Sequence, residues 1–323
     1  MEKLLITGAT GYIGRFLTRR LLEDGYSVSL LTRDKHKVPN EFKTKGCKIY
    51  QGDIKNKDTL KDIEEVDGIF HLAADKTING DREILWRANV LGTKNLLDLS
   101  LKLGVKKFIF ASSIEAVGPA SLAALPVDET FPPKPANPYG ESKLDAEELV
   151  NEYHKKDSLN TVVARIGTVY GLGIPFIFPI VESLLSKDKF SQMSYPFYDR
   201  YIHLIYITDL IELLIRCYVL PVINGKTYFL VGNNYIKFKE LTKLIAFFIG
   251  KDLFFIDENK PLEGPVHMAY ANKKAREELG FSPLVDIEKG IGRTIIWFFQ
   301  NGYLPIKTGL KQRLRNYVRS FVK

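Results

Sequence analysis

The chain has 323 residues, of which 45% are hydrophobic and 26% charged, a composition typical of a soluble globular protein with a large buried core. The formal net charge is +8, but six basic residues and no acids fall between Lys307 and Lys323, so the rest of the chain is close to neutral. A neutral body excludes nucleic-acid binding along a basic surface, and the lack of an apolar run of about eighteen residues excludes a membrane-spanning helix.

Two cysteines, Cys47 and Cys217, lie far apart and form no CxxC pair. Their spacing predicts reduced, buried thiols in a cytoplasmic protein rather than a disulfide or a metal site. The chain begins with the strand-like residues Lys3 to Thr7, so we expect no signal peptide and a cytoplasmic location.

Strand and helix patterns alternate through the first half of the chain. Short apolar strands separated by helices are typical of an α/β protein with a doubly wound parallel sheet and helices on both faces. The strands are predicted near residues 3–7, 27–32, 47–51, 67–73, 106–112 and 160–166, with helices at 12–23, 82–103 and 139–156.

The C-terminal half has shorter elements. Five prolines between Pro126 and Pro138 predict an irregular loop, and a second irregular region begins at Gly171. A strand passing into a helix is expected over 202–215, a strand at 226–231, and helices at 238–250, 269–279 and 286–301. We therefore predict a main domain of residues 1–170 plus about 203–232, and a smaller C-terminal lobe of residues 171–202 and 233–323 over the sheet's carboxyl edge, where open α/β sheets bind ligands.

Three glycines, Gly8, Gly11 and Gly14, recur at the junction between the first strand and the first helix. Glycine lets the backbone turn tightly and approach a pyrophosphate, while the helix N-terminus directs amide hydrogens at it. The spacing is GxxGxxG rather than GxGxxG, yet its place in a strand–turn–helix unit favours a dinucleotide site over a turn that merely needs glycine. The main domain is thus predicted to bind a dinucleotide, and the lobe a small-molecule substrate.

The end of the second strand bears on which dinucleotide is bound. Thr32 stands where a carboxylate would bond the ribose of NAD, and Arg33 follows it. A guanidinium fits a 2′-phosphate with two hydrogen bonds, so NADP is the preferred cofactor. Asp34 keeps NAD open, and an exposed loop cation is the alternative for Arg33.

Tyr139 and Lys143 lie four residues apart, so they share one face of the predicted helix over 139–156. A free phenol, with a pKa of about 10, is a poor acid or base at neutral pH, but a neighbouring ammonium favours the phenolate and lowers that pKa. The pair follows a strand that ends in Ser112 and Ser113, which favours a proton donor over a structural tyrosine.

With these motifs in place, the chain resembles the extended short-chain dehydrogenases/reductases of the NAD-dependent epimerase/dehydratase family over nearly its full length. The resemblance implies a Rossmann-type sheet, a homodimer, and hydride transfer at a carbon that bears oxygen. The matching segments are Thr7–Gly14, Gly52–Asp53, His71–Ala74, Asn89–Val90 with Gly92–Thr93, Ser112–Ser113, Tyr139–Lys143, Arg165–Gly171 and Tyr206–Leu210.

The resemblance also implies roles for the matching residues. The predicted catalytic residues are Ser113, which would hold the substrate oxygen, Tyr139, which would exchange its proton, and Lys143, which would tune Tyr139. Asp53 would bond the adenine and Asn89 would support the helix beside the site, although a turn aspartate and a helix-packing asparagine are the plain alternatives. The predicted cofactor contacts are Gly8, Thr10, Gly11, Tyr12, Ile13, Gly14, Arg33, Asp53, Ile54, Leu72, Ala73, Ala74, Asn89, Tyr139, Lys143 and Ile166.

Departures from the family pattern narrow the reaction. Glu115 matches the glutamate of sugar-nucleotide 4,6-dehydratases, but Ile114 replaces their aspartate, the general acid, so a 4,6-dehydratase is disfavoured. Val117 replaces a tyrosine common in nucleotide-sugar epimerases, and Thr168 stands where many members have an asparagine. The predicted substrate contacts are Ser113, Glu115 and Thr168.

The family's usual arginine for binding a diphosphate is also replaced in this sequence, which leaves two substrate classes open. Ile202 occupies the position of the usual arginine, and the nearest candidates are Arg200 and Arg293. One class is a sugar or nucleotide sugar; the other is an apolar ketone or aldehyde, as in the steroid and dihydroflavonol reductases. The aromatic residues near the predicted pocket fit the second class or a plain core: Phe176, Phe178, Phe197 and Tyr198.

Other functional classes lack their motifs. No two of the five histidines stand at metal-ligand spacing, and neither a GxxxxGK[ST] loop nor a GxSxG elbow occurs, so we expect no metal site, phosphoryl transfer or hydrolysis. If residues 307–323 are helical, their apolar residues fall on one stripe and most of their basic residues fall elsewhere. We favour a helix that packs on the body of the protein over a helix that contacts a membrane surface. The stripe consists of Leu310, Leu314, Val318 and Phe321.

We therefore predict an NADP- or NAD-dependent oxidoreductase or epimerase that acts on a secondary alcohol or ketone of a sugar or nucleotide sugar. An NADP-dependent reductase of an apolar ketone or aldehyde is the alternative. A non-catalytic, cofactor-sensing protein on the same fold is disfavoured, because Ser113, Tyr139 and Lys143 are all present.

Overall fold

The fold is built on a seven-stranded parallel sheet in a computed structural model that describes residues 1–173, 176–186, 199–251, 253 and 265–304. The strand order is β3-β2-β1-β4-β5-β6-β9, and every neighbouring pair is parallel. The predicted Rossmann-type, doubly wound sheet is therefore confirmed. The strands are β1 (Lys3–Thr7), β2 (Ser27–Thr32), β3 (Lys48–Gln51), β4 (Gly68–His71), β5 (Lys107–Ser113), β6 (Thr161–Ile166) and β9 (Lys226–Leu230).

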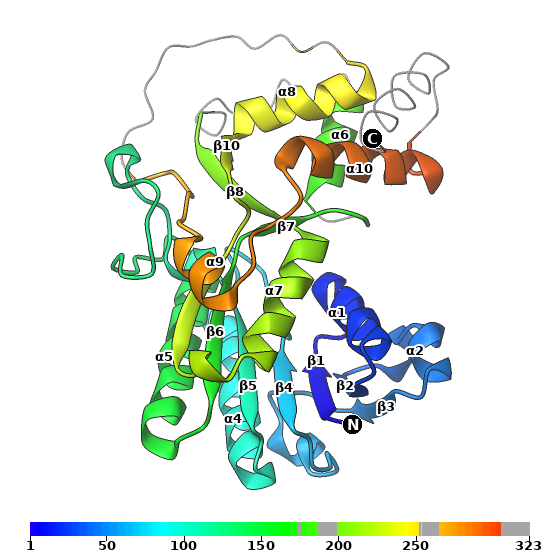
Figure 1. The fold of residues 1–323 in the computed structure, drawn as a ribbon, viewed down its shortest axis with the longest axis vertical. Helices are drawn as coiled ribbons and strands as arrows, with labels where there is room; N and C mark the ends of the chain where they lie inside the picture. The colour runs from blue at the N-terminus through cyan, green and yellow to red at the C-terminus, as the bar shows by residue number, and fades with distance from the viewer. Residues whose placement is uncertain (174–175, 187–198, 252, 254–264, 305–323) are drawn as a thin grey trace.

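Helices cover both faces of this sheet (Figure 1). On one face lie α1 (Tyr12–Glu23) and α7 (Ile207–Val219), and on the other α4 (Gly92–Leu103) and α5 (Pro138–Asp157). The alternation of side chains along β1 fixes this arrangement: Leu4 and Ile6 join the core under α1 and α7, whereas Leu5 joins the core under α4 and α5. All three side chains are fully buried, as expected for a parallel sheet that is covered on both faces.

The strand order reverses at β1, because β1 lies between β2 and β4. Open α/β sheets bind ligands at such a point, in the crevice outside the carboxyl ends of the strands. Thr7, the last residue of β1, pairs with His71, the last residue of β4. The crevice therefore begins at these two residues.

A smaller lobe stands over the carboxyl ends of the main sheet (Figure 1). It contains a second sheet, in which β8 (Tyr201–Tyr206) is parallel to β7 (Thr168–Tyr170) and antiparallel to β10 (Tyr235–Lys237). The helices of the lobe are α6 (Ile177–Leu185), α8 (Phe238–Ile249) and α10 (Ile287–Gln300). A further helix, α9 (Lys273–Leu279), packs against β9.

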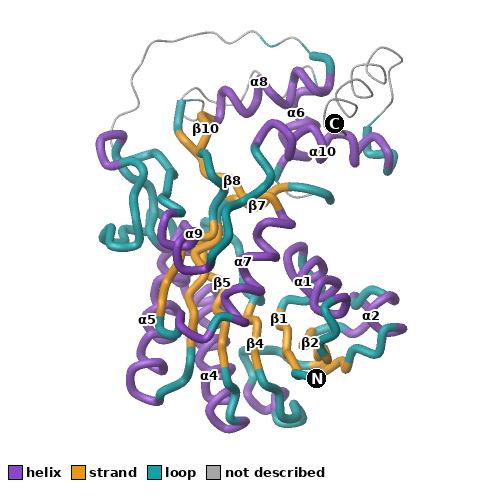
Figure 2. The backbone as a smooth tube through the Cα atoms, viewed as in Figure 1, coloured by secondary structure: helices purple, strands orange, loops and turns teal. Residues whose placement is uncertain are grey.

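Several elements differ from the prediction (Figure 2). The helix expected over 82–103 is divided by a π-helical turn at Arg87–Leu91 into α3 (Arg82–Trp86) and α4. The helix expected from residue 269 begins only at Lys273, because Tyr270 forms a bridge with Val127. Short elements that the sequence analysis missed are α2 (Asn40–Thr44), α6, β7 and β10.

Cys47 and Cys217 are buried free thiols, as predicted. Within the described ranges, no helix is long and apolar enough to cross a membrane. The apolar stripe within residues 307–323 and the aromatic residues Phe197 and Tyr198 lie outside the described residues.

Candidate active site

A cavity of about 800 Å³ opens at the crevice where the strand order reverses. The turns that follow β1 to β6 supply most of its lining. A cavity of this size can enclose an extended ligand of cofactor dimensions. Most of the predicted site residues line it: Gly8, Thr10, Gly11, Tyr12, Ile13, Gly14, Arg33, Asp53, Ile54, Leu72, Ala73, Ala74, Ser113, Tyr139 and Ile166.

The glycine turn leaves no room for side chains. Gly8 has φ +70°, a conformation that favours glycine, and a Cβ there would lie 2.8 Å from the backbone nitrogen of Ala73. A Cβ on Gly14 would lie 2.3 Å from the carbonyl oxygen of Gly8. Gly11 closes the turn by donating its N–H to that same oxygen at 2.9 Å. The first turn of α1, from Tyr12, therefore lies on the cavity wall, where its unpaired amides favour an anion.

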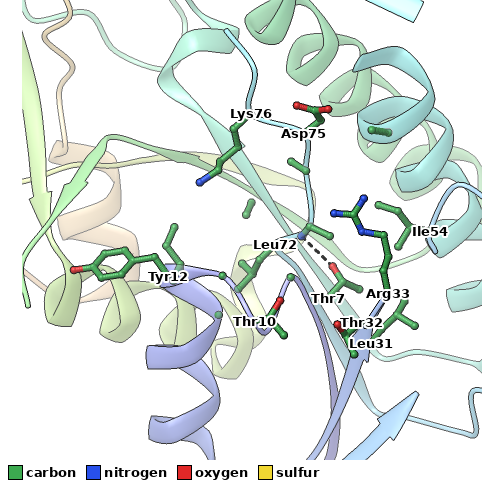
Figure 3. Close-up of a pocket in the computed structure, with 18 of the residues that line it drawn as sticks. Thr7, Thr10, Tyr12, Leu31, Thr32, Arg33, Ile54, Leu72, Asp75 and Lys76 are labelled. Carbon is green, nitrogen blue, oxygen red and sulfur yellow. Dashed lines mark hydrogen bonds between the residues drawn. The ribbon is translucent and has the colours of Figure 1, made fainter. Parts of the chain in front are cut away.

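A hydrogen bond ties this turn to the strand beside it. Thr7 Oγ1 accepts the N–H of Ala73 at 3.1 Å, the dashed line in Figure 3. The end of β1 and the segment after β4 are thereby held together at the floor of the cavity.

Charged side chains gather at the end of the cavity beyond β2 and β3. Arg33 extends its guanidinium over the cavity from the end of β2 (Figure 3). Lys37 and Lys55 line the same end, and the sequence analysis missed both of these cations. Asp34 also lines it, but its carboxylate accepts the N–H of His36 at 2.9 Å and so caps the short helical turn that follows.

Asp75 and Lys76 also line the cavity, directly after the predicted alanine contacts (Figure 3). The sequence analysis missed both, although their place beside those alanines was an available signal. Hydrogen bonds from Thr77 lower the pKa of the Asp75 carboxyl, and the positive charges of Arg33 and Lys55 lower it further. Arg33 and Asp75 thus line the cavity close enough for their charges to interact.

Ser113 and Tyr139 meet on the cavity wall where β5 and α5 approach each other. Tyr139 is 9% exposed, and burial raises the pKa of its phenol to about 12, despite a hydrogen bond with the Ser113 hydroxyl that lowers it. The charge of Glu115 raises it as well. At neutral pH the phenol is therefore protonated and able to donate.

Lys143 is buried on the same helix and does not line the cavity. Its Nζ donates to the carbonyl oxygen of Ala111 at 2.7 Å and lies 4.0 Å from the ring centroid of Phe110. Burial lowers the pKa of Lys143 to about 7, although the charge of Glu147 acts in the opposite direction. The predicted lowering of the Tyr139 pKa by this amine is not seen in the structure, because burial is the largest influence on both groups.

Three other predicted contacts also lie off the cavity wall. Asn89 is buried and bonds the backbone of Asp75 on both its N–H and its C=O. Its amide is therefore engaged by the protein, so Asn89 supports the wall instead of lining it. Glu115, in the turn after β5, accepts a hydrogen bond from Asn137 at 2.7 Å. Thr168, the first residue of β7, stands between two residues that do line the cavity.

The residues considered for a diphosphate differ in position. Ile202 is buried in β8. Arg200 is partly buried and lies close enough to Glu115 for their charges to interact. Arg293 is exposed on α10. Arg200 is therefore the better placed of the two arginines to reach the region beside Ser113.

Two aromatic residues of the lobe, Phe176 and Phe178, have different surroundings. Phe176 lines the cavity together with Ile166 and Val169, which gives this end an apolar wall. Phe178 instead packs edge to face on Phe298, with 5.2 Å between the ring centroids. Only the first of these two phenylalanines can meet a ligand.

Comparison with known proteins agrees with this geometry. Residues 4–218 match the NAD dependent epimerase/dehydratase family. A putative UDP-glucose 4-epimerase of Methanocaldococcus jannaschii is 28% identical over 316 residues, which cover 92% of this chain and 99% of the relative. A dTDP-glucose 4,6-dehydratase of Streptomyces antibioticus is 30% identical over 325 residues, which cover 92% of each protein.

Solved structures give the same fold. The crystal structure of UDP-glucose 4-epimerase from Thermotoga maritima with UDP-glucose aligns over 93% of this chain and 99% of its own, with a TM-score of 0.78 at 22% identity. The family match extends over more than half of the chain and includes the glycine turn and the Tyr139–Lys143 pair. This protein therefore belongs to the NAD-dependent epimerase/dehydratase family, the enzymes of the extended short-chain dehydrogenase type.

Proposed function

We propose that this protein transfers a hydride between a nicotinamide dinucleotide and a secondary alcohol or ketone carbon of a sugar or nucleotide sugar. The dinucleotide, when bound, accepts or supplies the hydride. In the alcohol-forming direction, the Tyr139 hydroxyl gives its proton to the substrate oxygen, which Ser113 holds by a hydrogen bond; in the other direction, the Tyr139 phenolate takes that proton back. We assign the stabilisation of this phenolate to Lys143, whose positive charge would act against the effect of burial.

The observation that supports this mechanism is the meeting of Ser113 and Tyr139 on the wall of the cavity that begins at the glycine turn. Two hydroxyls from different elements can contact one substrate oxygen there. A phenol whose pKa is about 12 keeps its proton at neutral pH, which suits donation. The reverse step needs a cation to stabilise the phenolate, and Lys143 lies one helical turn away.

The assignment to sugars or nucleotide sugars rests on the chemistry beside Tyr139 and on the relatives. Glu115 and Arg200 bring opposite charges to this region, and such a pair suits hydroxyls or phosphates better than hydrocarbon. Two of the relatives that align over most of the chain carry nucleotide-sugar activities in their names, and another that does so is named as a 3beta-hydroxysteroid-dehydrogenase/decarboxylase. Loss of water from the substrate would need a general acid, and Ile114 replaces that acid. Oxidation, reduction or epimerisation of the substrate therefore fits better than dehydration.

A reductase of an apolar ketone or aldehyde is the second candidate. The observation that favours it is an apolar patch on the cavity wall, formed by Ile166, Val169 and Phe176. Polar and apolar substrates therefore belong in the same assay.

We also infer that NADP is preferred over NAD. Arg33, Lys37 and Lys55 supply three cations to the end of the cavity beyond β2 and β3, and a guanidinium binds a phosphate with two hydrogen bonds. Asp34 uses its carboxylate on the amide of His36, so it is less available to a ribose hydroxyl. The family is described as NAD-dependent, so NAD is expected to bind the same glycine turn with lower affinity.

Native mass spectrometry of the purified protein, followed by turnover assays, tests this function. A dinucleotide that stays bound favours an epimerase, and a dinucleotide that exchanges freely favours a reductase. Turnover of UDP-glucose and dTDP-glucose is followed by NMR, and turnover of an apolar aldehyde by the absorbance of NADPH. Tyr139→Phe should abolish turnover while the dinucleotide affinity stays within about twofold. Tyr153→Phe, on the same helix but outside the cavity, is the control; turnover that survives Tyr139→Phe refutes the proton-transfer assignment.

A further inference from the structure

A buried chain of hydrogen bonds connects the cavity wall at Asp75 to the backbone of Tyr139. Asn89 Oδ1 accepts the N–H of Asp75 at 2.8 Å, and Asn89 Nδ2 donates to the carbonyl oxygen of the same residue at 2.9 Å. Asn89 Nδ2 also donates to Ser142 Oγ at 2.8 Å, and Ser142 Oγ donates to the carbonyl oxygen of Tyr139 at 2.8 Å. We propose that Ser142 is a positioning residue: it joins Asn89, which supports the cavity wall, to Tyr139, and Asn89 and Ser142 together form a clamp that sets the place of the Tyr139 hydroxyl relative to that wall.

The clamp is buried and its polar groups are paired. Asn89 is 1% exposed and Ser142 is 4% exposed, so water does not readily replace a lost partner. The amide of Asn89 has two N–H donors and a carbonyl acceptor, and the structure engages all of them. Removing the Ser142 hydroxyl therefore leaves a buried N–H of Asn89 unpaired and removes one hydrogen bond from the carbonyl of Tyr139.

The backbone around Asn89 is shaped for this contact. A π-helical turn at Arg87–Leu91 interrupts the helix between α3 and α4, and such turns are frequent at functional sites. The carbonyl oxygen of Asn89 accepts the hydroxyl of Thr93 at 2.5 Å, and Thr93 Oγ1 meets His71 Nε2 at 3.0 Å. The clamp is thereby anchored to the end of β4.

A second contact ties the same segment to Tyr139. The N–H of Tyr139 donates to the carbonyl oxygen of Ile78 at 3.4 Å, a long and weak hydrogen bond. Tyr139 is thus held on its N–H by the segment after β4 and on its C=O by Ser142. Lys143 follows Ser142 directly, so a shift of this wall moves both groups of the proposed proton-transfer pair. A misplacement of about 1 Å can lower a rate roughly a hundredfold.

Hydrogen–deuterium exchange tests the clamp without any substrate. Ser142→Ala, Ser142→Thr and Ser100→Ala are compared as full-length proteins; Ser100 is the matched control because it is fully buried in α4 and donates to Leu96 at 2.7 Å within one helix. Ser142→Ala should speed exchange in peptides that span residues 73–80 and 137–143. Ser100→Ala and Ser142→Thr, which keeps the hydroxyl, should exchange there as the wild type does. Equal exchange in Ser142→Ala and Ser100→Ala overturns the clamp, whatever the enzyme's substrate.

Kinetics then separate positioning from a general structural defect, and this arm rests on the proposed function. Ser142→Ala should lower kcat roughly ten- to a hundredfold, with KM and the dinucleotide Kd within about twofold, and Ser142→Thr should restore most of kcat. A kcat equal to that of Ser100→Ala, or a parallel loss of kcat and dinucleotide affinity, overturns the positioning role. A wild-type enzyme that turns over none of the substrates refutes the proposed function instead, and the exchange result then decides the clamp alone.

Discussion

Glu147 and Arg165 form a buried ion pair behind the site. Arg165 Nη2 lies 2.8 Å from Glu147 Oε2, and the two side chains are 8% and 3% exposed. Ser112, at the end of β5, donates its hydroxyl to the same carboxylate. The pair joins β6 to α5 and so holds the helix that carries Tyr139 against the sheet.

Glu147→Gln leaves the charge of Arg165 buried without a counter-charge, and should lower the free energy of unfolding by about 3–5 kcal/mol in urea titrations. The double variant Glu147→Leu with Arg165→Met should recover most of this loss, because apolar packing replaces a buried ion pair at little cost. Glu152→Gln, in an exposed pair with Lys156 on the same helix, should leave the free energy of unfolding unchanged. A double variant as unstable as Glu147→Gln would show that packing, and not the buried charge, causes the loss.

Arg33→Ala should separate the two dinucleotides. Hydrogen bonds to a charged group contribute about 1.5–3 kcal/mol, so the Kd for NADP should rise roughly ten- to a hundredfold while the Kd for NAD changes little. Isothermal titration calorimetry measures both constants. Lys35→Ala, an exposed cation nearby that does not line the cavity, should alter neither. Equal weakening of NAD and NADP by Arg33→Ala would contradict a 2′-phosphate contact.

His71 and His203, two of the buried histidines, are neutral. His203 Nε2 donates to the carbonyl oxygen of Gly232 at 3.0 Å, and His203 Nδ1 accepts the N–H of Tyr270 at 3.1 Å, so a second ring proton would oppose that N–H. Burial lowers the pKa of His203 to about 4 and the pKa of His71 to about 3, where the charge of Lys143 adds to the effect. Both rings therefore resist protonation in the folded state.

The stability of the protein should fall as the solution becomes acidic. A histidine whose folded pKa lies below its unfolded value of about 6.5 stabilises the fold above that pH, and the contribution is lost as the pH decreases. At pH 5, His71 and His203 should each lower the free energy of unfolding by about 2 kcal/mol relative to pH 7. Burial raises the pKa of Glu129 and of Asp209, which act in the opposite direction, so the net loss is smaller than the sum.

Urea unfolding at pH 7 and pH 5 measures this loss. His36→Ala, at an exposed position, should leave the difference between the two values unchanged. A free energy of unfolding that stays constant between pH 7 and pH 5 would show that the buried histidines are not the groups that titrate.

Gly14→Ala should disturb the glycine turn more than Gly11→Ala. A Cβ on Gly14 meets backbone atoms of Gly8 and Ala9 at 2.3 and 2.7 Å, and backbone cannot rotate away. A Cβ on Gly11 meets a single atom, the carbonyl oxygen of Gly8, at 3.1 Å. Gly14→Ala should lower the free energy of unfolding by about 1–3 kcal/mol, and the loss in Gly11→Ala should be smaller. Thermal unfolding of both variants checks the order.

The elements that the sequence predicted well carry a long apolar period bounded by turn residues. The strand at 27–32 and the helix at 12–23 have the predicted bounds. β7 and β10 contain three residues each, too few for a period, and they become strands by pairing with β8. α6 has only nine residues and is apolar nearly throughout, with Pro179 in its first turn, so its buried stripe does not stand out in the sequence. The stripe consists of Ile177, Ile180, Val181 and Leu184.

Among the residues that line the cavity, those with a local sequence signal could also be predicted, and those brought there by the fold could not. Gly8 and Gly14 could be identified because a tight turn depends on the local chain. Lys37 and Lys55 carry no local signature, since only the strand order brings their two turns to one cavity. The spacing of Tyr139 and its lysine likewise predicts proximity, but the pKa of the phenol depends on burial, which spacing does not reveal.

The connections between the lobe and the main sheet are very short. β6 ends at Ile166 and β7 begins at Thr168, so Gly167 alone separates the two sheets, and β8 runs directly into α7. A Cβ on Gly167 would lie 2.9 Å from Val231 Cγ1, so the chain leaving β9 packs on the same junction. A ligand that enters therefore meets walls already in place, and ordering them adds little entropic penalty to its binding.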